Sequence, residues 1–164
     1  MGRAPAWEHD YCTYYAARRR AFVRTAYAIL GSWAAAEDVT QSTFTQLYVH
    51  WPRIHDETRD AYARRALVNA CYTAGRKAAR EPSLAEVPDR EAVAPESVDP
   101  ELMAALGQLS AKHRAVVVLR YLDDLSVAEV ARVLDLPEGT VKSQAARALS
   151  RLETVLTSSE GARA

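Results

Sequence analysis

The stretch SVAEVARVLDLPEGTVKSQAARALSRL, residues 126–152, predicts two helices joined by a tight turn. Ser126 and Glu129 have the spacing of a capping box, which marks the start of the first helix. The second helix carries an apolar stripe at spacings of three and four residues. The members of this stripe are Val141, Ala145, Leu149, Leu152 and, further on, Leu156. A short helix, a turn and an amphipathic second helix make a helix-turn-helix.

The turn itself supports this interpretation. Ala131 is small where the two helices must cross, and Val141, ten residues on, supplies a buried aliphatic side chain to the second helix. Asp135 occupies the turn position that glycine usually takes, and aspartate tolerates the left-handed backbone better than most residues.

The other face of the second helix is positive and rich in hydrogen-bonding groups. From Gly139 to Leu152 the sequence contains no acidic residue. Recognition helices place their N-terminal residues on base edges and long cations on the flanking phosphates. Lys142 and Gln144 are therefore the base-edge candidates. The phosphate candidates are Arg147 and Arg151, with Ser143 on the same face. The alternative is an ordinary solvated helix face.

Outside this motif the chain is also predicted to be helical. The 164 residues suit one domain or two small ones, and residues 80–100 hold four prolines and almost no large apolar residue. We therefore expect an all-α fold of two small helical domains joined by a flexible linker at 81–100. The first module should contain helices near 7–30, 33–51 and 61–79, stopped at Gly31 and capped at Ser32.

Within the second module, helices are expected near 101–107 and 112–122, the latter capped by Ser110. Tyr62, on the third helix of the first module, is expected to pack in the core. The residues beyond 157 look like a disordered tail.

Charge is segregated along the chain although the formal net charge is zero. Residues 1–80 hold 12 Lys and Arg against 7 Asp and Glu, whereas residues 81–100 hold 1 against 6. A basic first half beside an acidic segment suits binding to a polyanion. No long apolar run or secretory signal is apparent, and Cys12 and Cys71 are expected to be reduced thiols of a cytoplasmic protein.

Two further stretches carry a family resemblance. AAAEDVTQSTFTQLYVHW, followed by DAYARRALVNACYTAGRK, resembles regions 2.2 to 2.4 of the extracytoplasmic-function (ECF) sigma factors of bacterial RNA polymerase. LSAKHRAVVVLRYLDDLSVAEVARVLDLPEGTVKSQAARALSRL resembles their region 4, and the wording is most similar to the actinobacterial SigE-like subfamily. The resemblance implies sigma region 2 at 7–80, region 4 at 101–157 and a tail at 158–164.

The resemblance assigns roles to positions in region 2. The core polymerase-binding residues would be Asp38, Gln41, Phe44 and Leu47, which match the helix that docks on the β′ subunit. Phe44 and Leu47 are alternatively core residues of this chain. The residues that contact the downstream −10 element would be Arg64, Arg65, Asn69, Tyr72, Arg76 and Lys77, with the loop at 55–60 holding a flipped base.

In region 4 the resemblance implies −35 contacts from Thr140, Lys142, Ser143, Gln144, Arg147 and Arg151. The expected partners are the β and β′ subunits of core polymerase, promoter DNA and, if one exists, an anti-sigma factor. No catalytic constellation, metal-ligand spacing or cofactor-binding loop is evident, so we expect no enzyme activity. Two rivals remain at this stage, a one-component transcriptional regulator and a helical adaptor that binds only protein.

Overall fold

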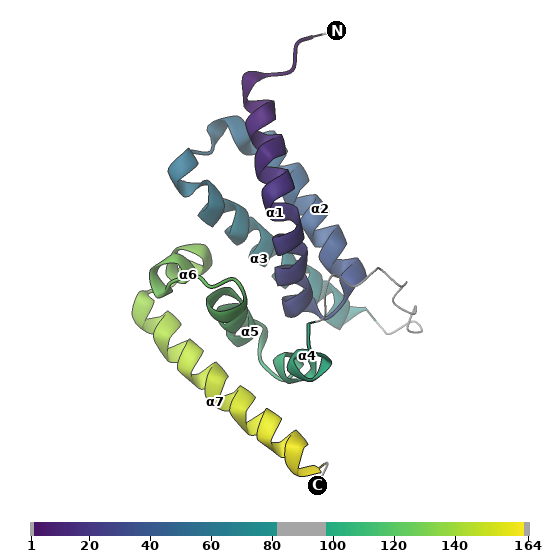
Figure 1. Cartoon of the computed structure of the whole chain (residues 1–164), viewed down its shortest axis with the longest axis vertical. Helices are drawn as coiled ribbons and strands as arrows, with labels where there is room; N and C mark the ends of the chain where they lie inside the picture. The colour runs from purple at the N-terminus through teal and green to yellow at the C-terminus, as the bar shows by residue number, and fades with distance from the viewer. Residues whose placement is uncertain (1, 82–97, 163–164) are drawn as a thin grey trace.

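The computed structural model describes residues 2–81 and 98–162 and is built from helices throughout that part of the chain, which confirms the all-α prediction (Figure 1). The first module consists of α1 (Ala6–Leu30), α2 (Trp33–His50) and α3 (Arg59–Arg80), with short 3₁₀ turns at Trp51–Arg53 and Asp56–Thr58. Most of the predicted linker lies outside the described residues.

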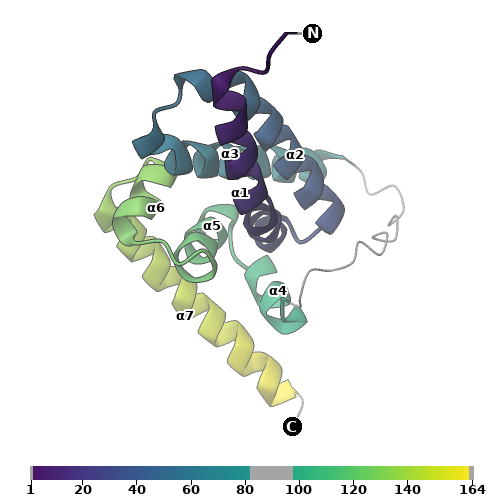
Figure 2. The same cartoon turned by 45° about the horizontal axis from the view of Figure 1, so that its top comes forward.

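The second module contains four helices in the described part of the chain. They are α4 (Pro100–Gly107), α5 (Ala111–Val117), α6 (Val127–Leu134) and α7 (Glu138–Ala162), and α5 continues into a π-helical turn at Val118–Leu122. α1 to α3 form one group in both views, and α7 runs away from them at the far side of the second group (Figures 1 and 2).

Local capping signals place the helix ends where the sequence predicts them. Gly31 ends α1 with φ 74°, a left-handed conformation that glycine adopts without steric cost. The Ser32 hydroxyl accepts a hydrogen bond from the N–H of Ala35 at 3.2 Å and so caps α2. Asp135 has φ 54° and ψ 50°, as the helix-turn-helix requires. The turn residue therefore adopts the predicted conformation.

The predicted capping box at the start of α6 is also present. The Glu129 N–H donates to the Ser126 hydroxyl at 3.1 Å, and the Ser126 N–H donates to the Glu129 carboxylate at 2.7 Å. That hydrogen bond from the Ser126 backbone holds the pKa of the Glu129 carboxyl below its ordinary value.

Ser126→Ala should therefore destabilise the protein by about 1 kcal/mol, because the Glu129 N–H in the first turn of α6 loses the hydroxyl that accepts its hydrogen bond. Urea-induced unfolding measures the change. Ser150→Ala, at an exposed position within α7, is the matched control and should leave stability nearly unchanged. Equal effects of the two substitutions would contradict the capping role.

Each module has a buried apolar centre. In the first, Phe22 and Phe44 lie with ring centroids 5.4 Å apart, and Leu47, Trp51 and Leu67 are each at most 1% exposed. The core of the second module contains Val116, Leu119, Val130, Val141 and Ala148, all at most 1% exposed. The helix-turn-helix is thereby held as a rigid unit.

Three sequence expectations need correction. The apolar stripe of α7 buries Val141, Ala145 and Leu152 as predicted, but Leu149 is 40% exposed and the adjacent Ala148 is fully buried instead. Tyr62 is also 40% exposed and does not pack in the core. Finally, α7 does not end near 157 but continues to Ala162, and the Ser159 hydroxyl near its end donates to Glu101 of α4 at 2.8 Å.

The two modules are in contact, which the sequence did not indicate. α6 packs against α3, and the π turn packs against α1. This contact between the modules fixes how the basic residues of α3 and the basic face of α7 lie relative to one another.

Candidate nucleic-acid interface

The basic face of α7 is available over most of its length. Lys142, Ser143, Arg147 and Arg151 are exposed, and Thr140 is half-buried. The Ser143 hydroxyl donates to the Thr140 carbonyl at 3.1 Å, which fixes its orientation at the start of the helix. Four predicted −35 residues therefore lie exposed on one helix that follows a helix-turn-helix turn.

Gln144 differs from its neighbours on α7. It is half-buried, and its side-chain Oε1 is buried without a hydrogen-bond partner. A buried amide oxygen without a donor is unfavourable, since it has lost its hydrogen bonds to water.

Four predicted −10 residues form a single stripe on α3. Arg65, Asn69, Tyr72 and Arg76 follow at spacings of four, three and four residues, which places them on one helical face. We call these four residues the α3 stripe. Arg65, Asn69 and Arg76 are exposed and Tyr72 is half-buried, while Lys77 lies exposed next to the stripe. The combination of cations, an amide and an aromatic ring suits single-stranded DNA.

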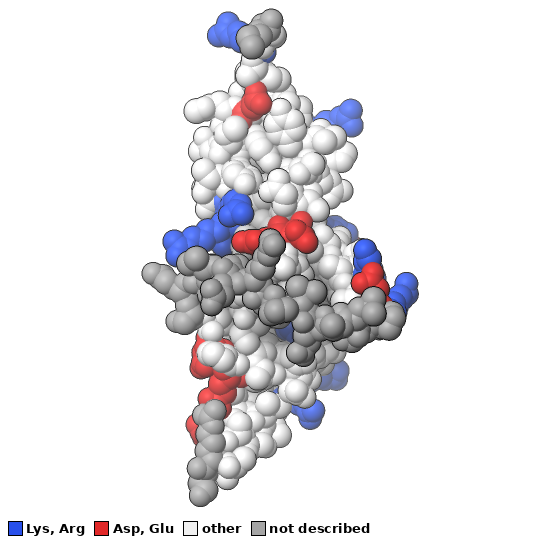
Figure 3. All heavy atoms as spheres, turned by 90° about the vertical axis from the view of Figure 1, so that its right-hand side faces the viewer, with Lys and Arg blue, Asp and Glu red and all other residues white. Residues whose placement is uncertain are grey.

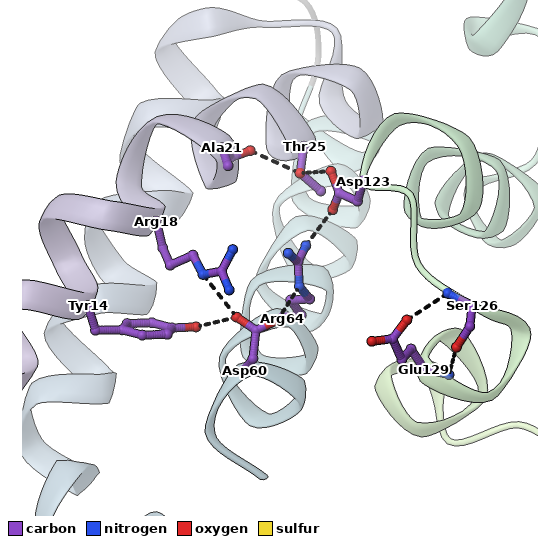
Figure 4. A network of polar contacts seen from close by, with 9 residues as sticks. All are labelled: Tyr14, Arg18, Ala21, Thr25, Asp60, Arg64, Asp123, Ser126 and Glu129. Carbon is purple, nitrogen blue, oxygen red and sulfur yellow. Dashed lines mark hydrogen bonds and ion pairs between the residues drawn. The ribbon is translucent and has the colours of Figure 1, made fainter. Parts of the chain in front are cut away.

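Arg64 lies elsewhere. Its side chain is only 8% exposed and forms ion pairs with Asp60 at 2.8 Å and with Asp123 at 2.7 Å (Figure 4). Burial opposes the charged form, but the hydrogen bond and the charge of Asp60, together with Asp123, outweigh it, so the pKa of Arg64 is raised. In this conformation Arg64 is not accessible to DNA.

Asp60 is the centre of a polar cluster within the first module. Its carboxylate accepts a hydrogen bond from the Tyr14 hydroxyl at 2.9 Å and pairs with Arg18 at 3.3 Å as well as with Arg64 (Figure 4). Burial acts to raise the pKa of Asp60, yet these donors and cations lower it overall. The cluster fixes the start of α3 against α1.

Asp123 belongs to the second module but its partners belong to the first. Its side chain is 7% exposed, and it accepts hydrogen bonds from the Thr25 hydroxyl of α1 at 2.7 Å and from Arg64 of α3 at 2.7 Å. Burial raises its pKa, and these contacts offset that effect only in part. The sequence did not predict this contact, because Thr25 and Asp123 are 98 residues apart and no local pattern marks their pairing.

A pocket of about 320 Å³ lies between the two modules, beside the turn of the helix-turn-helix. Its wall contains Arg65, Asn69 and Tyr72 from the α3 stripe and Gln144 from α7. Arg65 also forms a weak, exposed ion pair with Asp135 of the turn at 3.4 Å. The structure therefore brings together candidate base-reading residues of both modules.

The predicted polymerase-binding residues divide between the surface and the interior of α2. Asp38 and Gln41 are exposed, whereas Phe44 and Leu47 are 1% and 0% exposed. Phe44 and Leu47 therefore occupy the core, as in the alternative considered for them, and do not form an apolar surface patch. The upper part of the molecule seen from the side of α2 is mostly uncharged (Figure 3).

Within residues 2–81 and 98–162, no group of three His, Cys, Asp or Glu residues is placed to hold a metal ion. None of the described helices combines the length and apolarity needed to cross a bilayer. Cys12 is exposed and Cys71 is buried, and burial raises the pKa of the Cys71 thiol to about 12.

Comparison with protein families gives two matches that follow the two modules. Residues 14–81 match sigma-70 region 2, and residues 100–152 match sigma-70, region 4.

Curated relatives align over most of the chain. The RNA polymerase sigma-E factor of Streptomyces coelicolor is 34% identical over 148 residues, covering 87% of this chain and 84% of the relative. The same factor of Streptomyces avermitilis is 36% identical over 155 residues, covering 88% and 84%. The ECF RNA polymerase sigma factor SigL of Mycobacterium tuberculosis is 32% identical over 148 residues and 81% of each chain.

Two solved structures share the fold. The sigma factor RpoE of Bartonella quintana, solved in complex with the anti-sigma factor NepR, has a TM-score of 0.74 at 24% identity and covers 90% of this chain and 97% of its own. CnrH, solved in complex with the cytosolic domain of CnrY, has a TM-score of 0.70 at 20% identity, with 92% and 90% coverage. These likenesses extend over both modules.

Proposed function

The chain belongs to the sigma-70 family and is a promoter-recognising RNA polymerase sigma factor of the ECF group, and from this premise we propose which residues carry each step of its work. Family membership decides against the one-component regulator and the protein-only adaptor. It also means that the chain is a non-enzymatic initiation factor. We assign region 2 to residues 7–80 and region 4 to residues 101–157.

Region 4 reads the −35 element through α7. Lys142 and Gln144 lie in the N-terminal half of the helix, where side chains reach base edges in the major groove. Arg147 and Arg151 lie one and two turns further on and hold the flanking phosphates, while Thr140 and Ser143 add hydrogen bonds at the start. The observation that carries this proposal is the exposed face of α7 over residues 139–152, which holds no acidic residue and follows the helix-turn-helix turn.

Region 2 binds the −10 element through the α3 stripe and Lys77. Arg65, Arg76 and Lys77 follow the backbone of the melted strand, Tyr72 stacks on a base and Asn69 reads a base edge. Tyr62, which is exposed near the start of α3 although the sequence predicted it in the core, is an additional stacking candidate. Arg64 contributes indirectly by holding Asp60 in place.

The exposed side of α2 docks on core polymerase. Asp38 and Gln41 offer hydrogen-bond acceptors to a basic partner surface on β′. The buried side chains of Phe44 and Leu47 hold α2 against the core of region 2. The cytoplasm is where such a subunit meets polymerase. Binding of an anti-sigma factor to this chain is a proposal motivated by the two complexes named above.

Run-off transcription tests the function as a whole. Purified chain is mixed with core polymerase and a promoter library, and specific transcripts are sequenced. We expect transcripts from a defined set of promoters that share upstream and downstream elements. Absence of specific transcripts, with polymerase active on another sigma factor, would contradict the proposal.

Arg147→Ala should weaken binding of region 4 to all duplexes alike, because a phosphate contact carries no sequence information. The slope of log affinity against log salt should fall by about 1, since one fewer counterion is released. Fluorescence anisotropy with a duplex selected in the run-off assay and with an unrelated duplex measures both quantities. Arg19→Ala, which removes an exposed cation from α1, is the matched control. A change of sequence preference in Arg147→Ala would contradict the phosphate role.

A further inference from the structure

The pocket of about 320 Å³ beside the helix-turn-helix turn lies where α3, α5 and the turn between α6 and α7 meet. We call it the intermodule pocket. The side chains that give it its polar character are Arg65, Asn69, Tyr72, Lys112, Asp135 and Gln144. We propose that this pocket binds a free purine ribonucleotide whose base carries an exocyclic amino group. The inference goes beyond the proposed function, because it concerns a small molecule and not promoter DNA.

The size and the wall of the intermodule pocket suit a base and its ribose. Ligand pockets begin at about 300 Å³, and their walls combine apolar surface with a few polar groups. Here the apolar surface comes from Val133, Leu134 and Leu136 of region 4 and from the ring of Tyr72 in region 2. Nucleobases stack on such rings. Burial raises the pKa of the Tyr72 hydroxyl, so the ring stays neutral beside a phosphate near pH 7.

Two amides line the pocket, and one of them lacks a partner. Asn69 is exposed, whereas Gln144 is half-buried. The Oε1 atom of Gln144 is buried, and no donor among the described residues reaches it. A buried acceptor is costly unless it receives a hydrogen bond. The exocyclic amino group of adenine or guanine is a donor of the required kind, and the Asn69 amide can pair with a second group on the same base.

Cations lie where the phosphates of such a ligand would emerge. Tyr72 and Lys112 line both the intermodule pocket and a neighbouring cleft of about 700 Å³, whose wall also contains Arg76. Lys112 and Arg76 are exposed, and neither has an ion pair within residues 2–81 and 98–162. Phosphate oxygens form charge-assisted hydrogen bonds with both side-chain types. Positive charge without a carboxylate partner therefore favours a phosphate at this junction.

Asp135 favours a ribonucleotide over a DNA strand. Its carboxylate is exposed and pairs with Arg65 only at 3.4 Å, so its oxygens remain accessible. A carboxylate in a nucleotide site accepts hydrogen bonds from ribose hydroxyls, whereas it repels a phosphate backbone. The 2′-hydroxyl is the group that distinguishes the two sugars.

Isothermal titration calorimetry of the full chain, without polymerase or DNA, tests the proposal. ADP and GDP are the probes. IDP has a purine without the amino group, the 2′-deoxy form of the preferred probe lacks one hydroxyl, and ribose 5-phosphate has no base. We expect one probe molecule per chain with a Kd below about 1 mM. IDP and the deoxy form should bind more weakly, and ribose 5-phosphate should show no binding.

Tyr72→Leu should weaken binding of the preferred probe roughly 5- to 140-fold, because the base loses its stacking surface. Tyr62→Leu is the matched control, since Tyr62 lies exposed on the same helix but does not line the pocket. Its affinity should equal that of the original chain. Gln144→Leu should remove the preference over IDP, because the acceptor of the amino group is gone.

Lys112→Ala should weaken binding about 2- to 5-fold, the effect of one exposed ion pair. Lys142→Ala removes an equally exposed lysine from α7, outside the pocket, and should leave the affinity unchanged. Both lysines would matter equally if the nucleotide were held by general attraction to positive charge.

A folded chain that binds neither ADP nor GDP would overturn the proposal, as would equal losses in the two lysine variants. Equal affinity for IDP would overturn the role of the amino group, and equal affinity for the deoxy form would assign the pocket to DNA bases instead. Circular dichroism identifies a Tyr72→Leu chain that has lost helix, in which case Lys112→Ala decides. Run-off transcription is no part of this test, so failure of the proposed function leaves its result unaffected.

Discussion

Arg76→Glu combined with Lys77→Glu is expected to slow open-complex formation about 100-fold, because reversing two adjacent cations places like charges beside the backbone of the melted strand. Such repulsion costs several kcal/mol, and 1.4 kcal/mol corresponds to a factor of ten. Both side chains are exposed, and the only ion pair that the structure gives either of them within its described residues is Lys77–Glu81 at 3.9 Å, so the fold should survive.

Permanganate footprinting of thymines in the −10 element measures the opening directly. Binding to a −35 duplex is the internal control and should stay unchanged. Arg76→Gln with Lys77→Gln should give a smaller defect than the glutamate pair, since it removes attraction without adding repulsion. If strand separation proceeds at the original rate in the glutamate variant, the α3 stripe does not bind the melted strand.

Most of the fold was predictable because its signals are local. Gly31, Ser32, Ser126 and Asp135 each act on backbone groups within four residues, so a single sequence suffices to place the helix ends. The length of α7 was not predictable in this way. Its last turns are held in part by Ser159 and Glu101, which are distant in the sequence.

The sequence predicted which residue types make up the candidate site, but not which of these side chains are exposed. The spacing of Arg65, Asn69, Tyr72 and Arg76 already places them on one face of a helix. Arg64, adjacent in the sequence and equally basic, looked equivalent, yet it is buried by Asp123 from the other module. Long-range pairing of this kind leaves no periodic pattern, so charge alone cannot separate a DNA contact from an internal ion pair.

Phe44→Ala should destabilise region 2 by about 3–5 kcal/mol, the usual cost of truncating a buried phenylalanine. Phe44 is 1% exposed, its ring centroid lies 4.8 Å from that of Tyr15 and 5.4 Å from that of Phe22, and its carbonyl accepts a hydrogen bond from Tyr11. Domain stabilities are commonly about 5–15 kcal/mol, so much of the total would be lost. Urea unfolding measures the loss.

Phe44→Leu separates a core role from direct contact with polymerase. Leucine keeps the position apolar and fills much of the volume, so the cost in stability should be smaller than for alanine. If Phe44 acts only from the core, binding to the β′ subunit should remain near its original strength in Phe44→Leu. Gln41→Ala, on the exposed side of α2, should show the opposite combination, with stability kept and binding weakened. Loss of binding in Phe44→Leu at nearly full stability would instead mean that α2 turns this ring outward to meet polymerase.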